Sequence, residues 1–189
     1  MRIIAGTLKG RRLASPTWDG LRPTSDRLRE TIFNVLGPSV VDARVLDVCA
    51  GTGAIAIEAL SRGASRATCL ESDARAVALI RANAAAVGLE KRCIIVRGQA
   101  PGGLTPAGLD GPYDLVVLDP PYDAPWIADA VAASAALVEG DGRIVLEHAA
   151  RVTAPDVPGL VRERTRRAGD SALTTYRPGV NGERGDTEG

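Results

Sequence analysis

From residue 44 to residue 147 the chain alternates between short apolar runs and longer segments with helical periodicity. This alternation constrains the fold more than any other feature of the sequence. Apolar runs of strand length occupy 45–49, 67–71, 93–96, 115–118 and 143–147. Helical patterns occupy 53–62, 73–87 and 126–137. Repeated strand–helix units of this length are typical of a parallel sheet that carries helices on both faces.

The C-terminal part of the sequence adds two more strands to this pattern. Residues 160–167 and 172–177 flank the turn formers Gly169-Asp170, which predicts a closing antiparallel hairpin. We therefore expect an α/β fold with a doubly wound, mostly parallel sheet of seven strands.

The N-terminal segment has a different pattern from the rest of the chain. Residues 2–13 form two short strand-like pieces around a Gly/Lys turn, which predicts a hairpin. A helix is expected after Pro23, with Thr24 or Ser25 as its N-cap and Gly37 at its end. The expected organisation is a basic hairpin-helix extension that recognises RNA (1–39), a sheet domain (40–178) and a polar, disordered tail (179–189).

Charge is balanced over the chain but not along it. Lys and Arg total 23, as do Asp and Glu, so nucleic-acid binding would require a local basic patch. The first 36 residues hold seven basic and three acidic residues, which makes them the first candidate. Ordinary solvated arginines are the alternative. The candidate RNA-binding residues are Arg2, Lys9, Arg11, Arg12, Arg22, Arg27 and Arg29.

The sequence carries no pattern typical of a metal site or a disulfide framework. Cys49, Cys69 and Cys93 lie in or beside apolar runs and form no CxxC pair, which predicts reduced cysteines in the core. His148 has no partner at metal or triad spacing, so we expect a structural role. Neither a signal peptide nor a membrane-length apolar run is present, and a cytoplasmic protein is expected.

The strongest indication of a ligand lies where the first strand turns into the first helix. The segment 47–53, DVCAGTG, ends in glycines that let the backbone approach a ligand at the carboxyl ends of the strands. Glu71 closes the second strand, where a carboxylate suits the hydroxyls of a ribose. A tight structural turn is the alternative to a nucleotide site.

Two nucleotide ligands fit this pattern. Residues 51–56, GTGAIA, match the dinucleotide pattern GxGxxG/A, so an NAD-dependent oxidoreductase is one interpretation. Asp47 argues against it, because a carboxylate there would repel a pyrophosphate but could receive the cationic amino-acid part of S-adenosylmethionine.

A second motif ends the run Leu115 to Leu118. Asp119 is followed by Pro120 and Pro121, which stiffen the segment and leave carbonyls free as acceptors, and Tyr122 adds an aromatic face. A carboxylate, a free carbonyl and an aromatic plane suit a planar group that carries an NH2. Such a segment has no evident role in hydride transfer, whereas methyl transfer to an amine explains it.

Together these motifs resemble class I S-adenosylmethionine-dependent methyltransferases that act on exocyclic amines, which have a Rossmann-like fold. The segments RIIAG…KGRRL, LRPTSDRLRETIFNVL, LDVCAGTGAIAIEALSRGA and LDPPY are similar, more narrowly, to the bacterial 16S ribosomal RNA guanine-N2 methyltransferase family (RsmD-like). The resemblance runs from Arg2 to about Arg177.

The resemblance implies methyl transfer to the N2 amine of a guanine in 16S ribosomal RNA, as naked RNA or within an assembling small subunit, by a monomer without a metal. It assigns the amine to Asp119 and Pro120, next to Pro121, with Tyr122 stacking on the base. Its cofactor residues would be Asp47, Cys49, Ala50, Gly51, Thr52, Gly53, Glu71, Ser72, Gln99, Ala100 and Asp119. Gln99 departs from the family, where Asp or Asn usually precedes the alanine.

Three other functions stay open from the sequence. DPPY alone also fits methylation of another nucleobase or of a protein amide. A non-catalytic RNA-binding protein could keep the same fold. The glycine loop and DPPY together argue against that last alternative.

Overall fold

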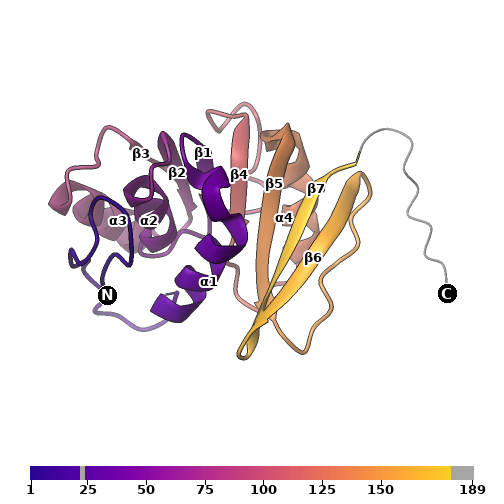
Figure 1. Cartoon of the computed structure of the whole chain (residues 1–189), viewed down its shortest axis with the longest axis horizontal. Helices are drawn as coiled ribbons and strands as arrows, with labels where there is room; N and C mark the ends of the chain where they lie inside the picture. Colours follow the sequence, from indigo (N-terminus) through magenta and orange to yellow (C-terminus); the bar gives the residue numbers. More distant parts are fainter. Residues whose placement is uncertain (22–23, 180–189) are drawn as a thin grey trace.

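The computed structural model describes residues 1–21 and 24–179, and within them one seven-stranded sheet forms the centre of the molecule. The strands run in the order β3-β2-β1-β4-β5-β7-β6, from left to right in Figure 1. The first five strands in this order pair in parallel, β7 pairs antiparallel with β5, and β6 pairs antiparallel with β7. The strands are β1 (Arg44–Val48), β2 (Arg66–Glu71), β3 (Cys93–Arg97), β4 (Tyr113–Leu118), β5 (Val138–Ala149), β6 (Leu160–Ala168) and β7 (Ser171–Pro178). The predicted doubly wound, mostly parallel sheet is confirmed.

Helices cover both faces of the sheet. The helices are α1 (Asp26–Leu36), α2 (Ala54–Ser61), α3 (Ala74–Ala86) and α4 (Ile127–Ser134), with short 3-10 turns η1 (Gly37–Val40) and η2 (Ala135–Leu137). Buried residues of α1, α2 and α3 pack with Val45, Val117 and Val145 on one face. Residues of α4 pack with Leu46 and Leu118 on the other. Successive residues of each strand therefore enter two different cores, as strand geometry requires. No helix of the described ranges has the length and hydropathy of a membrane span.

The N-terminal segment is held by side chains of α2. The predicted hairpin is present: an antiparallel bridge joins Arg2 and Arg12, the Ile3 N–H donates to the Arg11 carbonyl at 3.0 Å, and the Leu13 N–H donates to the Met1 carbonyl at 3.1 Å. The N–H groups of Ile4 (2.8 Å) and Ala5 (2.9 Å) turn instead to α2, where the Glu58 carboxylate accepts from both. The hairpin prediction is therefore confirmed, although the pairing is a single bridge without extended strands, and the segment is part of the same core as the sheet domain.

Two local predictions near the ends of elements are confirmed. Ser25 caps α1, its hydroxyl accepting from the Leu28 N–H at 3.1 Å, and Gly37 follows the helix with a φ of 57°. His148 is buried in the sheet and shares a 2.9 Å hydrogen bond with the Thr174 hydroxyl, which agrees with a structural role. Burial lowers the pKa of His148.

Strand order reverses between β1 and β4, whose carboxyl ends lie side by side. Loops leave such a point in opposite directions, which opens a crevice there in α/β sheets. Both sequence motifs, residues 47–53 and 119–122, lie at this point.

Candidate active site

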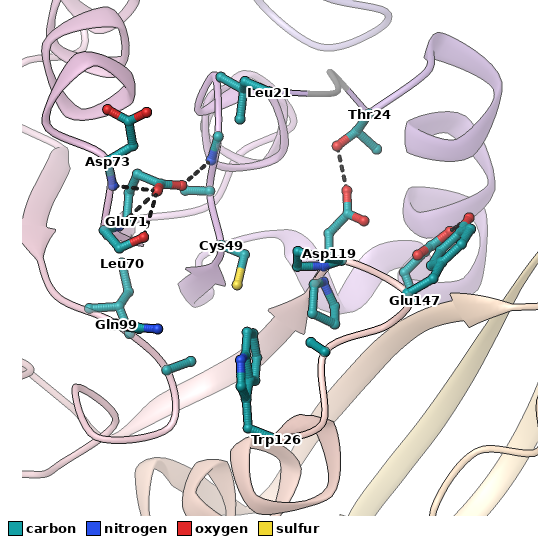
Figure 2. Close-up of a pocket in the computed structure, with 18 of the residues that line it drawn as sticks. Leu21, Thr24, Cys49, Leu70, Glu71, Asp73, Gln99, Asp119, Trp126 and Glu147 are labelled. Carbon is teal, nitrogen blue, oxygen red and sulfur yellow. Dashed lines mark hydrogen bonds between the residues drawn. The ribbon is translucent and has the colours of Figure 1, made fainter. Parts of the chain in front are cut away.

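A cavity of about 700 Å³ lies over the carboxyl ends of β1, β2 and β4. Its wall is built from the segments 49–52, 70–73, 98–100 and 119–126, together with Gly20, Leu21, Thr24, Leu28 and Glu147. Figure 2 shows Glu71 and Gln99 on one side and Asp119 and Glu147 on the other. The structure therefore brings the glycine loop and DPPY into one site. Its volume is in the range of small-molecule sites.

The wall of this cavity is acidic. Five carboxyl side chains line it, and none of its described lining residues is Lys, Arg or His. The five are Glu71, Asp73, Asp119, Asp123 and Glu147. Such a wall favours cations and N–H donors and disfavours a pyrophosphate. This charge argues against the dinucleotide interpretation of the glycine loop.

Glu71 organises the glycine loop. Its Oε2 accepts from the Gly51 N–H at 2.8 Å, and its Oε1 accepts from the N–H groups of Ser72 (2.7 Å) and Asp73 (2.9 Å). Because a carboxylate oxygen has two lone pairs, Oε2 can still accept from a ligand hydroxyl. The site therefore fits a ribose at this position.

The two glycines of the loop are required for different reasons. Gly51 has a φ of 56°, and a Cβ there would lie 3.3 Å from Leu21 Cδ1 in the segment above. Gly53 has a φ of 73°, and a Cβ there would lie only 2.8 Å from Ile80 of α3. Gly51 lines the cavity, whereas Gly53 is buried and begins α2. The prediction that Gly53 contacts the cofactor is therefore corrected to a packing role.

Asp47 also lies outside the cavity wall, which corrects its predicted contact with the cofactor. Strand alternation turns its side chain under α2, where it is 0% exposed and its Oδ2 accepts from the Ala56 N–H at 3.0 Å. Oδ1 has no hydrogen-bond partner among the described residues. Burial raises the pKa of Asp47 to about 8, and the nearby charges of Asp119 and Glu71 add to this. A bound proton at neutral pH lowers the cost of this burial.

Six further predicted cofactor residues line the cavity: Cys49, Ala50, Thr52, Ser72, Gln99 and Ala100. Burial raises the pKa of the Cys49 thiol to about 12, so it is protonated at neutral pH. Gln99 lies at the Glu71 side of the cavity (Figure 2). Cys69 and Cys93 are free and buried, as expected.

Asp119 is held by a residue from the N-terminal extension. Its Oδ2 accepts from the Thr24 hydroxyl at 2.5 Å, a contact drawn in Figure 2. Pro120 and Pro121 line the cavity beside it. Tyr122 also lines the cavity, and its hydroxyl donates to Glu147 Oε1 at 2.7 Å and shares a 2.7 Å hydrogen bond with Ser171. These two hydrogen bonds fix the position of the Tyr122 hydroxyl and so limit the orientations of its ring.

Several lining residues were not predicted from the sequence, and Thr24, Glu147 and Trp126 are the most informative of them. Thr24 was considered only as a helix cap, and Glu147 only as the end of a strand. Trp126 packs partly against the core of α4 and also lines the cavity, near Cys49 in Figure 2. For Trp126 a signal was available, because an aromatic four residues after a substrate-binding motif is well placed to share its site.

The predicted basic surface is only partly present. Arg2, Lys9, Arg11, Arg12 and Arg27 are exposed, whereas Arg22 lies outside the described residues.

Arg29 is the exception, and its prediction as an RNA-binding residue was wrong. It is 0% exposed, donates to Asp26 (2.6 Å) and to the Arg2 carbonyl (2.9 Å), and lies 3.8 Å from Glu58. It fastens α1 to the N-terminal segment.

Comparison with known proteins agrees with this architecture. The family model described as Conserved hypothetical protein 95 matches residues 1–177. The Ribosomal RNA small subunit methyltransferase D of Escherichia coli is 37% identical over 199 residues, which cover 97% of this chain and 92% of that protein.

Solved structures give the same result. The Escherichia coli protein yhhF superposes with a TM-score of 0.81 at 35% identity, covering 94% of this chain and 97% of that one. A Thermus thermophilus protein superposes with a TM-score of 0.78 at 30% identity, over 94% and 99% of the two chains. An O-methyltransferase from Bacillus cereus, solved in complex with SAH, shares the fold at 14% identity, with a TM-score of 0.66 over 82% of each chain. The chain has the class I methyltransferase fold and belongs to the Conserved hypothetical protein 95 family, the family of the small-subunit RNA methyltransferase D proteins.

Proposed function

We propose that this protein transfers the methyl group of S-adenosylmethionine to the exocyclic N2 amine of a guanine in 16S ribosomal RNA. The observation that carries the proposal is the common cavity of the glycine loop and DPPY. At one side, Glu71 offers an acceptor beside a tight backbone turn. At the other, Asp119 and Pro120 offer acceptors for an amine. The names of the relatives and the segments outlined above support ribosomal RNA as the substrate.

The residues of the cavity fit this cofactor. Glu71 Oε2 would accept from the ribose, and the protonated Cys49 and the apolar Ala50 would lie against uncharged parts of the molecule. The acidic wall would balance a sulfonium and an ammonium group. When bound, S-adenosylmethionine supplies an electrophilic methyl group.

The acceptor residues would act mainly by positioning. The lone pair of a guanine N2 amine is delocalised into the ring, which makes the nitrogen a weak nucleophile. Hydrogen bonds from the amine to Asp119 and to the Pro120 carbonyl would hold it in line with the methyl group and favour a pyramidal nitrogen. Asp119, which would accept a hydrogen bond from the amine, is also the proposed acceptor of the proton that the amine releases.

The direct test combines ribosomal RNA mapping with an Asp119 variant. Mass spectrometry of 16S RNA with and without the protein should reveal one N2-methylated guanine. Asp119→Ala should lower the rate of methyl transfer by about 100-fold or more, because it removes an acceptor used in the transition state. Calorimetry should show that it still binds S-adenosylmethionine. Near-normal turnover of the variant would refute the assignment of Asp119, and loss of cofactor binding would point to a structural defect.

The N-terminal extension is proposed to contact the phosphates of the RNA. Arg11 and Arg12 are exposed, although Arg11 also donates to the Ala86 carbonyl at 2.7 Å. Reversing both charges to Glu should weaken RNA binding about tenfold at moderate salt and lower the salt dependence of the affinity.

A matched control separates docking from net charge. Arg164 and Arg166 are exposed on the edge strand β6, so Arg164→Glu with Arg166→Glu makes the same change in net charge. A filter-binding titration should give a smaller loss for the control. Equal losses in the two variants would mean that net charge, and not the extension, sets the affinity.

A further inference from the structure

Glu147 enters the cavity directly beside the DPPY segment. In the parallel pair β4–β5, Leu118 lies opposite Leu146, so Asp119, just after the end of β4, lies beside Glu147, which is still within β5. Glu147 lines the cavity although its side chain is only 1% exposed. Figure 2 shows it on the Asp119 side, away from Glu71. At the acceptor end of the cavity, the carboxyl groups of Asp119 and Glu147 therefore lie on adjacent strands.

The two oxygens of Glu147 have different surroundings. Oε1 accepts from the Tyr122 hydroxyl at 2.7 Å, and that hydroxyl is also bonded to Ser171. Oε2 is buried and has no hydrogen-bond partner among the described residues. A buried carboxyl oxygen without a donor is costly. In a cavity wall, the donor that removes this cost can belong to the ligand.

Guanine has donors that match this pair of carboxyl groups. Its N1–H and its N2 amine lie side by side on one edge of the base. Adenine and cytosine instead place an unprotonated ring nitrogen next to their amine, and its lone pair would face a carboxylate. A site with one acceptor would take any of these amines, whereas a site with two adjacent acceptors favours guanine.

We propose that Glu147 Oε2 accepts the N1–H of the target base while Asp119 and the Pro120 carbonyl hold its N2 amine. Glu147 is then the residue that selects guanine over other amine-bearing bases. This inference rests on the function proposed above and explains why that site takes guanine. Tyr122 contributes by occupying Oε1, which leaves Oε2 for the base.

The test uses a base that keeps the 2-amino group but lacks the N1 proton. Target RNA is made with guanine or with 2,6-diaminopurine at the methylated position, and kcat/KM is measured for each. The wild-type protein should prefer guanine by about 100-fold or more, since a buried acceptor left facing a lone pair is strongly unfavourable.

Glu147→Gln should reduce this preference at least tenfold. The amide oxygen can still accept from Tyr122, and the NH2 group then occupies the place of Oε2, where it donates to an unprotonated N1. Ser171→Ala is the matched control, because it removes the other hydrogen bond of the Tyr122 hydroxyl and leaves the carboxyl group in place. It should keep the wild-type preference, and calorimetry with S-adenosylmethionine checks the folding of both variants.

The outcomes separate this inference from the function on which it rests. Equal rates on the two bases with the wild-type protein would overturn the role of Glu147 and leave guanine methylation standing, and this measurement needs no variant. An unchanged preference in folded Glu147→Gln would do the same. If the wild-type protein methylated no guanine at all, both the function and this inference would fail.

Discussion

The two ends of the cavity hold their carboxyl groups in different ways. Glu71 is fixed by main-chain N–H groups of Gly51, Ser72 and Asp73, all contributed by the turns that follow β1 and β2. Asp119 receives a hydroxyl from Thr24, which lies 95 residues away in the chain. The proposed cofactor end is therefore built by local turns of the sheet domain, whereas the acceptor end is complete only when the N-terminal extension is in place.

The strongest test of the cofactor end is Glu71→Ala. It removes the proposed ribose acceptor and also the acceptor of three backbone donors, so S-adenosylmethionine should bind at least about 100-fold more weakly. Titration calorimetry measures this change. Glu71→Gln is the control of similar shape and should lose less, because its amide oxygen can replace one of the carboxylate oxygens. If Glu71→Ala bound S-adenosylmethionine within about threefold of the wild-type affinity, Glu71 would not be the ribose acceptor, and the assignment of this end of the cavity to the cofactor would be refuted.

The second test concerns the buried Asp47 below the glycine loop. Its folded-state pKa of about 8 lies above its ordinary value of 3.8, so the folded protein keeps a proton that the unfolded chain releases. This contribution to stability is complete below about pH 4 and is lost as the pH rises toward 8, by at most about 1.4 kcal/mol per pH unit.

Urea denaturation between about pH 5 and pH 8 checks this slope. Asp47→Asn has no proton to lose and should unfold with a flatter pH dependence, while its amide oxygen still accepts from Ala56. If the variant and the wild-type protein lost stability in parallel over this range, the proton on Asp47 would not be the cause.

The smallest expected effect belongs to the contact between the two regions. Thr24→Val keeps the shape of the side chain and removes the hydroxyl that donates to Asp119, so kcat should fall about threefold to tenfold. Thr24→Ser restores the donor and should recover most of the rate. Cofactor affinity should stay unchanged in both, since Glu71 is untouched. A loss of cofactor binding in Thr24→Val would show that the two ends are not independent.

Most of the fold could be predicted because each strand and helix has its own apolar periodicity and its own turn residues. The glycine loop and DPPY were placed correctly at the cavity for the same reason, since both lie at the ends of buried strands. Ser25 was recognisable as a cap from its position before a helical pattern. Such features depend on neighbours in sequence.

Most of the errors concern residues whose surroundings are set by distant segments. Arg29 shares its helix with Arg27, and its burial depends on contacts with the Arg2 carbonyl and with Glu58. Asp47 was assigned to the ligand because a carboxylate suits the cationic amino-acid part of S-adenosylmethionine, whereas strand alternation, a local pattern, turns its side chain toward α2. Glu147 lies in an ordinary apolar strand, and its place beside Asp119 depends on the register between β4 and β5. The surroundings of Arg29 and Glu147 therefore could not be predicted from local patterns, whereas the direction of the Asp47 side chain could.

The clamp of Glu58 on Ile4 and Ala5 limits how this protein can be recombined. Glu58 and Arg29 are both fully buried, and each is bonded to the backbone of residues 2–5. A chimaera that exchanged the extension for an unrelated segment would remove Arg29 and the two N–H donors together, and would leave the buried Glu58 carboxylate with Arg62 as its remaining partner. Removing partners from a buried charge costs several kcal/mol in other proteins. The extension therefore cannot be replaced independently of the sheet domain. Substitutions in one limit which sequences the other can accept.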